Sequence, residues 1–505
     1  MKNLTLNKIA LLFFGLALLA NSINAQTALP TPPPPSAPRP VKIPAIQETK
    51  LPNGLRVVVV ERKNVPLVQA TLLIKTGAAQ EGEKAGLADL TASTLLKGTK
   101  TRTATQIAEQ IEFLGGNIDS RTNWETSTVS VNVTSDKIEQ AMTVMADAVL
   151  NPAFARSEID LLKTQTLDEL NVALKQPSTL ANFAAARYTF GEHSVVGTPE
   201  SLTNLSRADI AGYYKNQYKP ENSILIFVGD VSKTKADALA KRLFGVWKRT
   251  PPRREKEVFQ IQNTIPRVPP SPKNTVEKIL VVDLPNSGQA AVSYTRKLDE
   301  GRMRCFDIEK CENSDVYFPA VVSNAVLGGG YSARLNMEIR IKRGLSYGAG
   351  SNFNWRIDAS NFATRVQTKN ISAAEVADLT VQEIEKMTTG EIASVEMTPR
   401  KLSLTGDFGR DLSTNAALTQ RLIELYSFYL VPDVLRTYVN GVDKVSDADI
   451  KKFVASNVKG GNLIIVGDYK VFADDLKKRF PNQTVEVIPA SQLDLNRNDL
   501  KKQTK

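Results

Sequence analysis

An internal repeat constrains the fold of this 505-residue chain more than any other feature of its sequence. In the first copy, Ser206-Arg-Ala-Asp-Ile210 precedes a helical pattern, the apolar run Leu225-Ile-Phe-Val-Gly-Asp230 and a second helical pattern. In the second copy, about 240 residues later, Ser446-Asp-Ala-Asp-Ile450 and Leu463-Ile-Ile-Val-Gly-Asp468 stand in the same order. Agreement of order and spacing over about 35 residues indicates a duplication. The chain is therefore predicted to contain two homologous domains of about 200 residues each.

The hydrophobic periodicity of the first copy predicts a mixture of strands and helices. Runs rich in β-branched residues predict strands, and apolar residues spaced by three or four predict helices. The expected strands lie within 51–61, 65–77, 117–133 and 224–229. The expected helices lie at 86–96, 103–114, 136–150, 157–174, from 177, and at 235–244. We predict an α+β fold, in which each domain is an antiparallel-rich sheet covered by helices on one face.

The first 25 residues have the pattern of a secretory signal peptide. Lys2 and Lys8 accompany the apolar stretch 9–20, and Ala25 offers a small residue for cleavage. The apolar stretch is short for a membrane span, and an uncleaved N-terminal anchor is the alternative. No later stretch is long and apolar enough to cross a bilayer. We therefore expect a periplasmic or otherwise exported protein of the cell envelope.

Composition sets the remaining boundaries. The prolines between Pro30 and Pro44 predict a semi-rigid linker over 26–47, and six prolines predict an interdomain linker over 250–275. The two domains are then expected at 48–249 and 276–488, followed by a loosely ordered polar tail at 489–505.

The net charge of +11 is a mild bias for a chain of this length, since acidic residues are interleaved throughout and two of the lysines lie in the leader. Such a distribution argues against a nucleic-acid-binding protein. An acidic partner or an anionic surface is one interpretation of the excess, and an ordinary solvated surface is the simpler one.

The cysteines and the histidine limit the possible chemistry. Cys305 and Cys311, the two cysteines of the chain, lie close together in a polar segment, which favours a local disulfide in an oxidising compartment. A metal site there is the alternative, but no histidine or further cysteine lies nearby. His193 is the single histidine, so any mechanism that needs two imidazoles and any His-rich zinc site within this chain are excluded.

The segment Gly86-Leu-Ala-Asp-Leu-Thr-Ala-Ser-Thr-Leu-Leu-Lys-Gly-Thr99 resembles the zinc-site helix of the pitrilysin/insulinase-like peptidases. In that family the flanking Gly-Leu-Ala and Leu-Lys-Gly-Thr enclose His-x-x-Glu-His, an inverted zinc-binding motif. The five positions here read Asp89-Leu90-Thr91-Ala92-Ser93. Aspartate can bind zinc, neutral serine is a poor ligand, and Ala92 replaces the glutamate that activates the bound water. The resemblance implies degenerate catalytic positions at Asp89, Ala92 and Ser93.

Further matches to the family extend over about residues 48–485. Glu169, 76 residues after Ser93, matches the family's third zinc ligand and is either a vestigial ligand position or an ordinary surface carboxylate. In the second half, Leu327-Gly-Gly-Gly-Tyr-Ser-Ala-Arg-Leu335 and the residues after it resemble the segment whose Arg and Tyr, seven positions apart, bind the scissile peptide. Arg340 and Tyr347 have that spacing and are expected to bind substrate, unless both simply pack the second domain.

In the smaller bacterial branch of this family, one chain carries the zinc motif and a similar chain supplies the Arg/Tyr pair. The resemblance implies the metallohydrolase fold of mitochondrial-processing-peptidase domains. It also implies a non-catalytic, peptide-binding subunit without a metal or cofactor of its own, in a heteromeric zinc peptidase with zinc in the partner. The implied partners are a catalytic chain with His-x-x-Glu-His and an extended peptide. One alternative is a protein-binding scaffold without a proteolytic role. A weaker one is an enzyme that holds a hard cation with Asp89 and Glu169.

Overall fold

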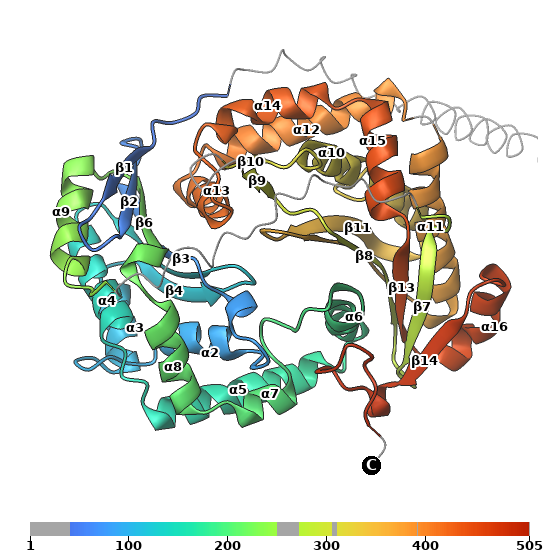
Figure 1. Ribbon diagram of the computed structural model, residues 1–505, viewed down its shortest axis with the longest axis horizontal. Helices are drawn as coiled ribbons and strands as arrows, with labels where there is room; N and C mark the ends of the chain where they lie inside the picture. Colours follow the sequence, from blue (N-terminus) through green and yellow to red (C-terminus); the bar gives the residue numbers. More distant parts are fainter. Residues whose placement is uncertain (1–40, 250–271, 306–310, 391, 504–505) are drawn as a thin grey trace, which may run out of the picture. The chain divides into compact units, whose positions relative to one another are not determined.

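Two six-stranded sheets form the framework of the computed structural model, which describes residues 41–249, 272–305, 311–390 and 392–503 (Figure 1). The predicted signal peptide at 1–25 lies outside the described residues, as do most of the linkers predicted at 26–47 and 250–275. Residues from Lys42 onward form one compact unit that contains both sheets.

The first sheet has the strand order β1-β2-β6-β3-β5-β4. Neighbouring strands are antiparallel except for β2 and β6, which run parallel. The β1 strand begins within the predicted linker. The strands are β1 (Gln47–Lys50), β2 (Arg56–Glu61), β3 (Leu67–Ile74), β4 (Asn117–Thr122), β5 (Ser127–Thr134) and β6 (Ser223–Gly229).

The second sheet has the order β11-β12-β8-β13-β7-β14. Here β7 runs parallel to both β13 and β14, and the other neighbours are antiparallel. Strands β9 and β10 form a separate two-stranded antiparallel sheet. The strands are β7 (Val276–Asp283), β8 (Ala290–Leu298), β9 (Met303–Cys305), β10 (Cys311–Asn313), β11 (Ser346–Trp355), β12 (Ser360–Thr368), β13 (Gly461–Gly467) and β14 (Val485–Pro489).

The two sheets share a core of five strands. The order β2-β6-β3-β5-β4 corresponds to β7-β13-β8-β12-β11, and each pair of neighbours has the same relative direction in both sheets. Only the sixth strand differs, because β1 is antiparallel to β2 whereas β14 is parallel to β7. The predicted α+β fold and its duplication are confirmed.

Helices follow the strands in a matching sequence in the two halves. In the first half they are α2 (Leu87–Thr94), α3 (Ala104–Phe113), α4 (Ile138–Leu150), α5 (Arg156–Ala173), α6 (Pro177–Ala185), α7 (Pro199–Asn204), α8 (Arg207–Gln217) and α9 (Lys233–Phe244). In the second half they are α10 (Tyr317–Leu327), α11 (Ala373–Thr389), α12 (Ser394–Asp411), α13 (Asn415–Ser427), α14 (Val434–Lys444), α15 (Asp447–Phe453) and α16 (Tyr469–Arg479).

The repeated Ser-x-Ala-Asp-Ile segment begins a helix in each half. Ser206 and Asp209 form a capping box before α8, and Ser446 and Asp449 form the same box before α15. Each box satisfies backbone N–H groups that the first helical turn leaves without partners. The isoleucine after the aspartate is fully buried in both copies. Both copies of the repeat therefore begin a helix with a capping box and anchor it in the core with a buried isoleucine.

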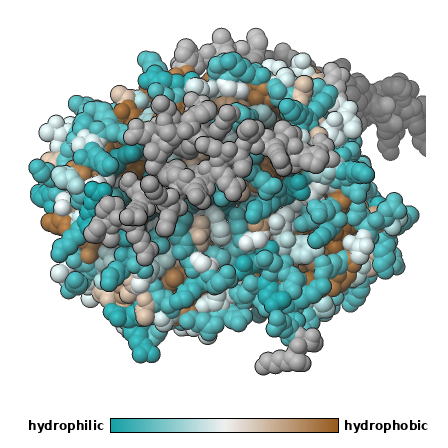
Figure 2. Space-filling view, in the orientation of Figure 1, coloured by the Kyte–Doolittle hydropathy of each residue, from teal (hydrophilic) through white to brown (hydrophobic). Residues whose placement is uncertain are grey.

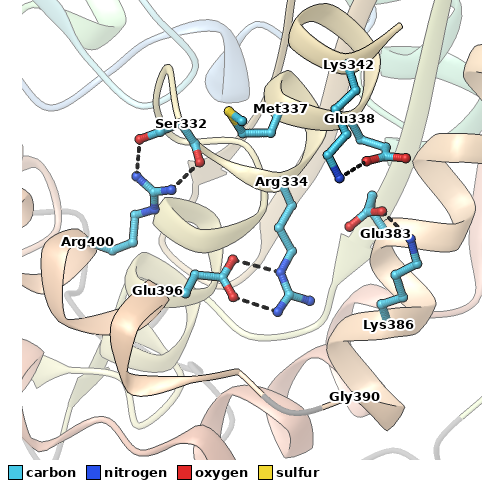
Figure 3. A pocket seen from close by; sticks show the side chains of 10 residues that line it. All are labelled: Ser332, Arg334, Met337, Glu338, Lys342, Glu383, Lys386, Gly390, Glu396 and Arg400. Atoms are coloured by element: carbon cyan, nitrogen blue, oxygen red, sulfur yellow. Dashed lines mark hydrogen bonds and ion pairs between the residues drawn. The ribbon is translucent and has the colours of Figure 1, made fainter.

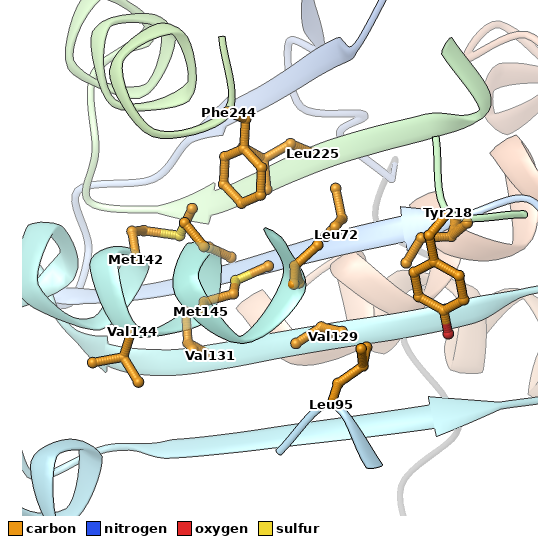
Figure 4. Packing of buried hydrophobic residues seen from close by; sticks show 14 of the residues in the cluster. Leu72, Leu95, Val129, Val131, Met142, Val144, Met145, Tyr218, Leu225 and Phe244 are labelled. Carbon is orange, nitrogen blue, oxygen red and sulfur yellow. The ribbon is translucent and has the colours of Figure 1, made fainter. Parts of the chain in front are cut away.

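The core of the first half lies between its sheet and helix α4. Met142 and Met145 of this helix face Leu72, Val131 and Leu225 of the central strands (Figure 4). All five side chains are fully buried, so the sheet and the helix remove apolar surface from water together.

One helix of each half packs on the sheet of the other half. The first half's α6 contacts β8 and β13, while the second half's α13 contacts β3 and β6. Leu180 and Ala184 of α6 lie in one buried cluster with Ile464 of β13. The expectation of helices on one face only is therefore wrong. Covering both faces explains why β6 is buried along its whole length.

The segment after β14 packs against the rest of the protein. Leu493 and Leu500 are buried in the cluster that contains α6. The hydroxyl of Thr198 donates to Oδ1 of Asn496 at 2.8 Å. The expected loose order of the tail at 489–505 is wrong for residues 489–503, because its few leucines bury apolar surface.

On the face shown in Figure 2, hydrophilic residues predominate and apolar residues lie in small separate groups. Among the described residues, no helix has the length and apolar character needed to cross a bilayer.

Candidate functional site

Helix α2 places the degenerate motif partly in the core. Ala92 is 1% exposed, and Leu90 and Thr91 are buried beside it. Asp89 and Ser93 lie one turn apart and are partly exposed. Burial raises the pKa of Asp89 to about 6. The helix thus presents one carboxyl and one hydroxyl where the family has two imidazoles.

Glu81 and His193 hold the first turn of α2. The backbone N–H groups of Gly86 and Ala88 donate to the two carboxyl oxygens of Glu81 at 2.8 and 2.6 Å. Nδ1 of His193 lies 3.3 Å from Oε1 of the same carboxyl. Burial raises the pKa of Glu81 to about 8, although both N–H donors oppose that change, and burial lowers the pKa of His193. The single histidine therefore contacts the carboxyl group that accepts hydrogen bonds from the first turn of α2.

The side chains near α2 do not fit a catalytic zinc ion. Glu169 is exposed on α5, a helix that adjoins α2. Among the described residues, no three His, Cys, Asp or Glu side chains are grouped as metal ligands. Catalytic zinc needs three protein ligands of these types, and the Ser93 hydroxyl is a weak substitute. Ala92 also provides no base for a bound water.

Arg340 and Tyr347 lie on adjoining elements of the second half. Arg340 belongs to a π-helical segment, Asn336–Lys342, and Tyr347 is the second residue of β11. The Tyr347 side chain is 92% exposed. The guanidinium carbon of Arg340 lies 5.0 Å from the ring centroid of Tyr331, which is itself 66% exposed. The structure therefore brings a cation and two exposed phenols to adjoining surface segments.

The guanidinium of Arg340 is available to a ligand. The nearest acid in sequence, Glu338, is engaged by Lys342 at 2.8 Å and by Arg343. Within the described parts of the chain, Arg340 has no carboxylate partner. A guanidinium in this state can donate to a peptide carbonyl or carboxylate.

A hollow of about 520 Å³ lies beside the π-helical segment (Figure 3). Arg334 and Glu396 form a bidentate pair across it, with both contacts at 2.8 Å. Arg400 donates to the side chain and backbone of Ser332. These contacts fasten the residues before the π-helical segment to helix α12.

The two cysteines lie in the paired strands β9 and β10. The register places Cys305 directly opposite Cys311. Opposed residues of an antiparallel pair have Cα atoms about 4.5–5.5 Å apart. A disulfide spans a similar separation. Their disulfide stays a prediction, with a backbone register that suits it.

Sequence reasoning missed two residues of these sites. Glu81 is an acidic residue shortly before the helix start at Gly86, and the affinity of helix N-termini for acids was the available signal. Tyr331 gave no signal, because its contact with Arg340 depends on the turn that follows α10.

Two family models match the chain. One described as "Insulinase (Peptidase family M16)" matches residues 56–195, and one described as "Peptidase M16 inactive domain" matches residues 204–398. An uncharacterized zinc protease of Mycobacterium leprae is 27% identical over 304 residues, which are 59% of this chain and 64% of that protein. The match thus spans just under two thirds of that relative. An uncharacterized zinc protease of Mycobacterium bovis is 25% identical over 384 residues, 75% of this chain and 83% of that protein.

Solved structures share the fold. The crystal structure of a peptidase M16 inactive domain from Pseudomonas fluorescens has a TM-score of 0.73 at 21% identity and covers 88% of this chain and 99% of that one. A protease from Helicobacter pylori has a TM-score of 0.72 at 20% identity and covers 84% of this chain and 99% of its own.

Proposed function

Because the chain belongs to peptidase family M16, we propose that it is a non-catalytic, peptide-binding subunit of a heteromeric zinc peptidase. The observation that carries the proposal is helix α2, in which Asp89, Ala92 and Ser93 stand where the resembled motif has two ligands and a base. Without these groups the chain cannot activate a zinc-bound water. A second chain of the family, with an intact His-x-x-Glu-His motif, would supply the zinc and the base.

The contribution of this chain is the Arg340/Tyr347 surface. The guanidinium would donate to a backbone carbonyl of an extended peptide, and the phenol would donate to the oxygen that becomes negative during hydrolysis. The exposure of Tyr347 supports this role, as does an Arg340 that has no carboxylate partner within the described residues. The chain's own residues thus bind and orient substrate, while the bond is broken on the partner.

The site of action in this proposal is the cell envelope. The leader with Lys2, Lys8 and the apolar stretch 9–20 supports export. N-terminal sequencing of the protein from a periplasmic extract should find a chain that begins after Ala25. Retention of the full leader on a cytoplasmic protein would refute export.

Reconstitution tests the proposal directly. The purified full chain should contain less than one tenth of an equivalent of zinc and should not cleave unfolded casein. Addition of a family chain with an intact zinc motif should give hydrolysis that Arg340→Ala lowers at least tenfold. Arg436→Ala, which removes an exposed arginine of α14, is the matched control. Zinc-dependent cleavage by the isolated chain, or unchanged turnover in the Arg340 variant, would contradict the proposal.

The second candidate is a protein-binding scaffold with no proteolytic role. Loss of the zinc ligands suits it equally well, but a guanidinium without a carboxylate partner among the described residues, next to the exposed Tyr331, favours the peptidase subunit. Copurification separates the two, because the first requires a partner with His-x-x-Glu-His and the second requires a different partner.

A further inference from the structure

A buried amide, that of Asn336, joins three segments at the surface of the second half. Asn336 is 4% exposed. Its Nδ2 donates to the backbone oxygen of Tyr331 at 2.5 Å, and its Oδ1 accepts from the backbone N–H of Ala349 at 3.2 Å. Asn336 also begins the π-helical segment, in which Arg340 follows four residues later. One side chain thus links the Tyr331 turn, the Arg340 segment and the β11 strand that carries Tyr347.

The start of β11, which carries Tyr347, pairs with β12 in an irregular register. Between Ser346 and Ala349 the pairing of β11 with β12 shifts, so that two residues of β11 oppose one residue of β12. This is a β-bulge, a feature that changes the direction of side chains at a strand edge. The Ser346 hydroxyl accepts from the N–H of Gly348 at 3.1 Å, and Asn336 satisfies the N–H at the far end of the bulge. The bulge and its two contacts set the direction of Tyr347.

Tyr331 limits the positions that Arg340 can adopt. A guanidinium against an aromatic face is attracted by the ring's quadrupole, and the 5.0 Å separation lies within the range of that interaction. Tyr331 remains 66% exposed beside this contact. A peptide whose carbonyl meets Arg340 would therefore also lie beside the Tyr331 ring, which suits apolar and aromatic side chains.

We infer that Tyr331 is a third peptide-contacting residue beside Arg340 and Tyr347, and that Asn336 is the positioning residue for all three. The inference rests on the proposed peptide-binding function. Asn336 acts through its two backbone hydrogen bonds, which hold the Tyr331 turn and the start of β11 against the segment that carries Arg340 before a peptide arrives. Pre-organisation of this kind improves affinity because less freedom is lost on binding.

The test measures binding of fluorescein-labelled unfolded casein to the full chain by anisotropy. Asn336→Leu, which keeps the bulk and removes both hydrogen bonds, should raise Kd about tenfold, and Tyr331→Ala should do the same. In an Arg340→Ala, Tyr331→Ala, Tyr347→Ala background, Asn336→Leu should change Kd less than twofold, since all three groups it positions are gone. Hydrogen exchange at Ala349 should accelerate in Asn336→Leu whether or not casein is present.

Asn370→Leu is the matched control. Its Nδ2 donates to the oxygen of Ser287 at 2.6 Å and its Oδ1 accepts from the N–H of Asp468 at 2.9 Å, so it is also an amide clamped between backbone groups. This variant should leave Kd within twofold. If Asn336→Leu does not fold, Asn336→Ser replaces it, and Tyr331→Ala still tests the surface residue.

The outcomes separate the two proposals. If the wild-type chain does not bind casein, the proposed function fails and the inference fails with it. If Arg340→Ala weakens binding while Asn336→Leu matches Asn370→Leu, the positioning role alone is wrong. If Tyr331→Ala binds as tightly as the wild type, Tyr331 is not a contact residue.

Discussion

The guanidinium of Arg356 in the second half holds the carboxylate of Glu192 in the first half through hydrogen bonds of 3.1 and 2.7 Å. Both side chains are largely buried, with 17% and 12% of their surface exposed. Asn361 donates to the same carboxylate at 2.8 Å, and Arg356 lies 5.3 Å from the ring centroid of Trp124. The turn between β11 and β12 is thereby fastened to the first half of the chain.

Breaking this pair should destabilise the protein. Arg356→Ala leaves a buried carboxylate without its cation, and we expect it to lower the free energy of unfolding by about 2–4 kcal/mol. Glu192→Gln should have a similar effect, and the double variant should lose less than the sum of the two. Urea unfolding of the full chain measures these changes. Arg410→Ala, which removes an exposed pair, is the control and should cost less than about 1 kcal/mol.

Asp89 should make stability depend on pH. Its pKa is raised to about 6, so the folded state holds the proton more tightly than the unfolded chain does. The sign follows: stability is greatest below the ordinary aspartate pKa and falls as the pH rises through about 6. Asp89→Asn removes the charge and should stabilise the protein by about 1–2 kcal/mol at pH 7.5, with no gain at pH 3.5. Urea unfolding at the two pH values measures this difference.

The control for Asp89 is Asp168→Asn on the adjoining helix α5. Asp168 is exposed, and its replacement should change stability by less than about 0.5 kcal/mol at either pH. A destabilising Asp89→Asn at pH 7.5 would show that the carboxylate has a stabilising partner in the folded protein.

The glycine of the repeated Val-Gly-Asp segment has a steric role. Gly229 has a φ of +137°, and a Cβ atom there would lie 2.1 Å from the backbone oxygen of Leu67. Gly229→Ala should therefore cost more than about 2 kcal/mol. Gly212→Ala, inside α8 with open space around it, should instead stabilise by about 0.5–1 kcal/mol. Thermal unfolding of the two variants measures their changes in stability. Equal changes in Gly229→Ala and Gly212→Ala would refute the steric explanation.

Local patterns predicted the elements but not their long-range packing. The helix expected at 103–114 is α3, with Thr103 as its cap and Gly115 in the left-handed region after it, because both signals act within one turn. The sequence did not predict that α6 and α13 each pack on the sheet of the other half. A short Ala-rich helix has no sequence signal for the sheet against which it packs.

The sequence likewise predicted some residues of the candidate site and missed others. Asp89, Ala92 and Ser93 of α2 could be identified from the sequence because the flanking motif residues define their positions. Glu81 and Asn336 were not found, because each acts through backbone groups that only the fold brings near. A polar residue in a sequence is ordinarily a surface residue, and Asn336 is an exception that its two buried hydrogen bonds explain.

Leu500 should anchor the C-terminal segment, which was expected to be loosely ordered. Leu500 is fully buried in the cluster that contains α6, and its backbone has a φ of +56°. Such a conformation costs about 1 kcal/mol for a leucine, so the burial of its side chain must offset that cost. Leu500→Ala keeps the backbone cost and loses the contact, and we expect a loss of about 2–4 kcal/mol by urea unfolding.

Two further variants complete the test of the tail. Leu402→Ala, at a position 45% exposed, should cost less than about 1 kcal/mol. A chain ended after Gln492 should lose at least as much stability as Leu500→Ala, because it also removes Leu493 and the contact of Asn496 with Thr198. It should also speed hydrogen exchange in α6, whose apolar face shares this cluster. A truncated chain with wild-type stability and wild-type exchange in α6 would mean that the tail rests on the protein without supporting it.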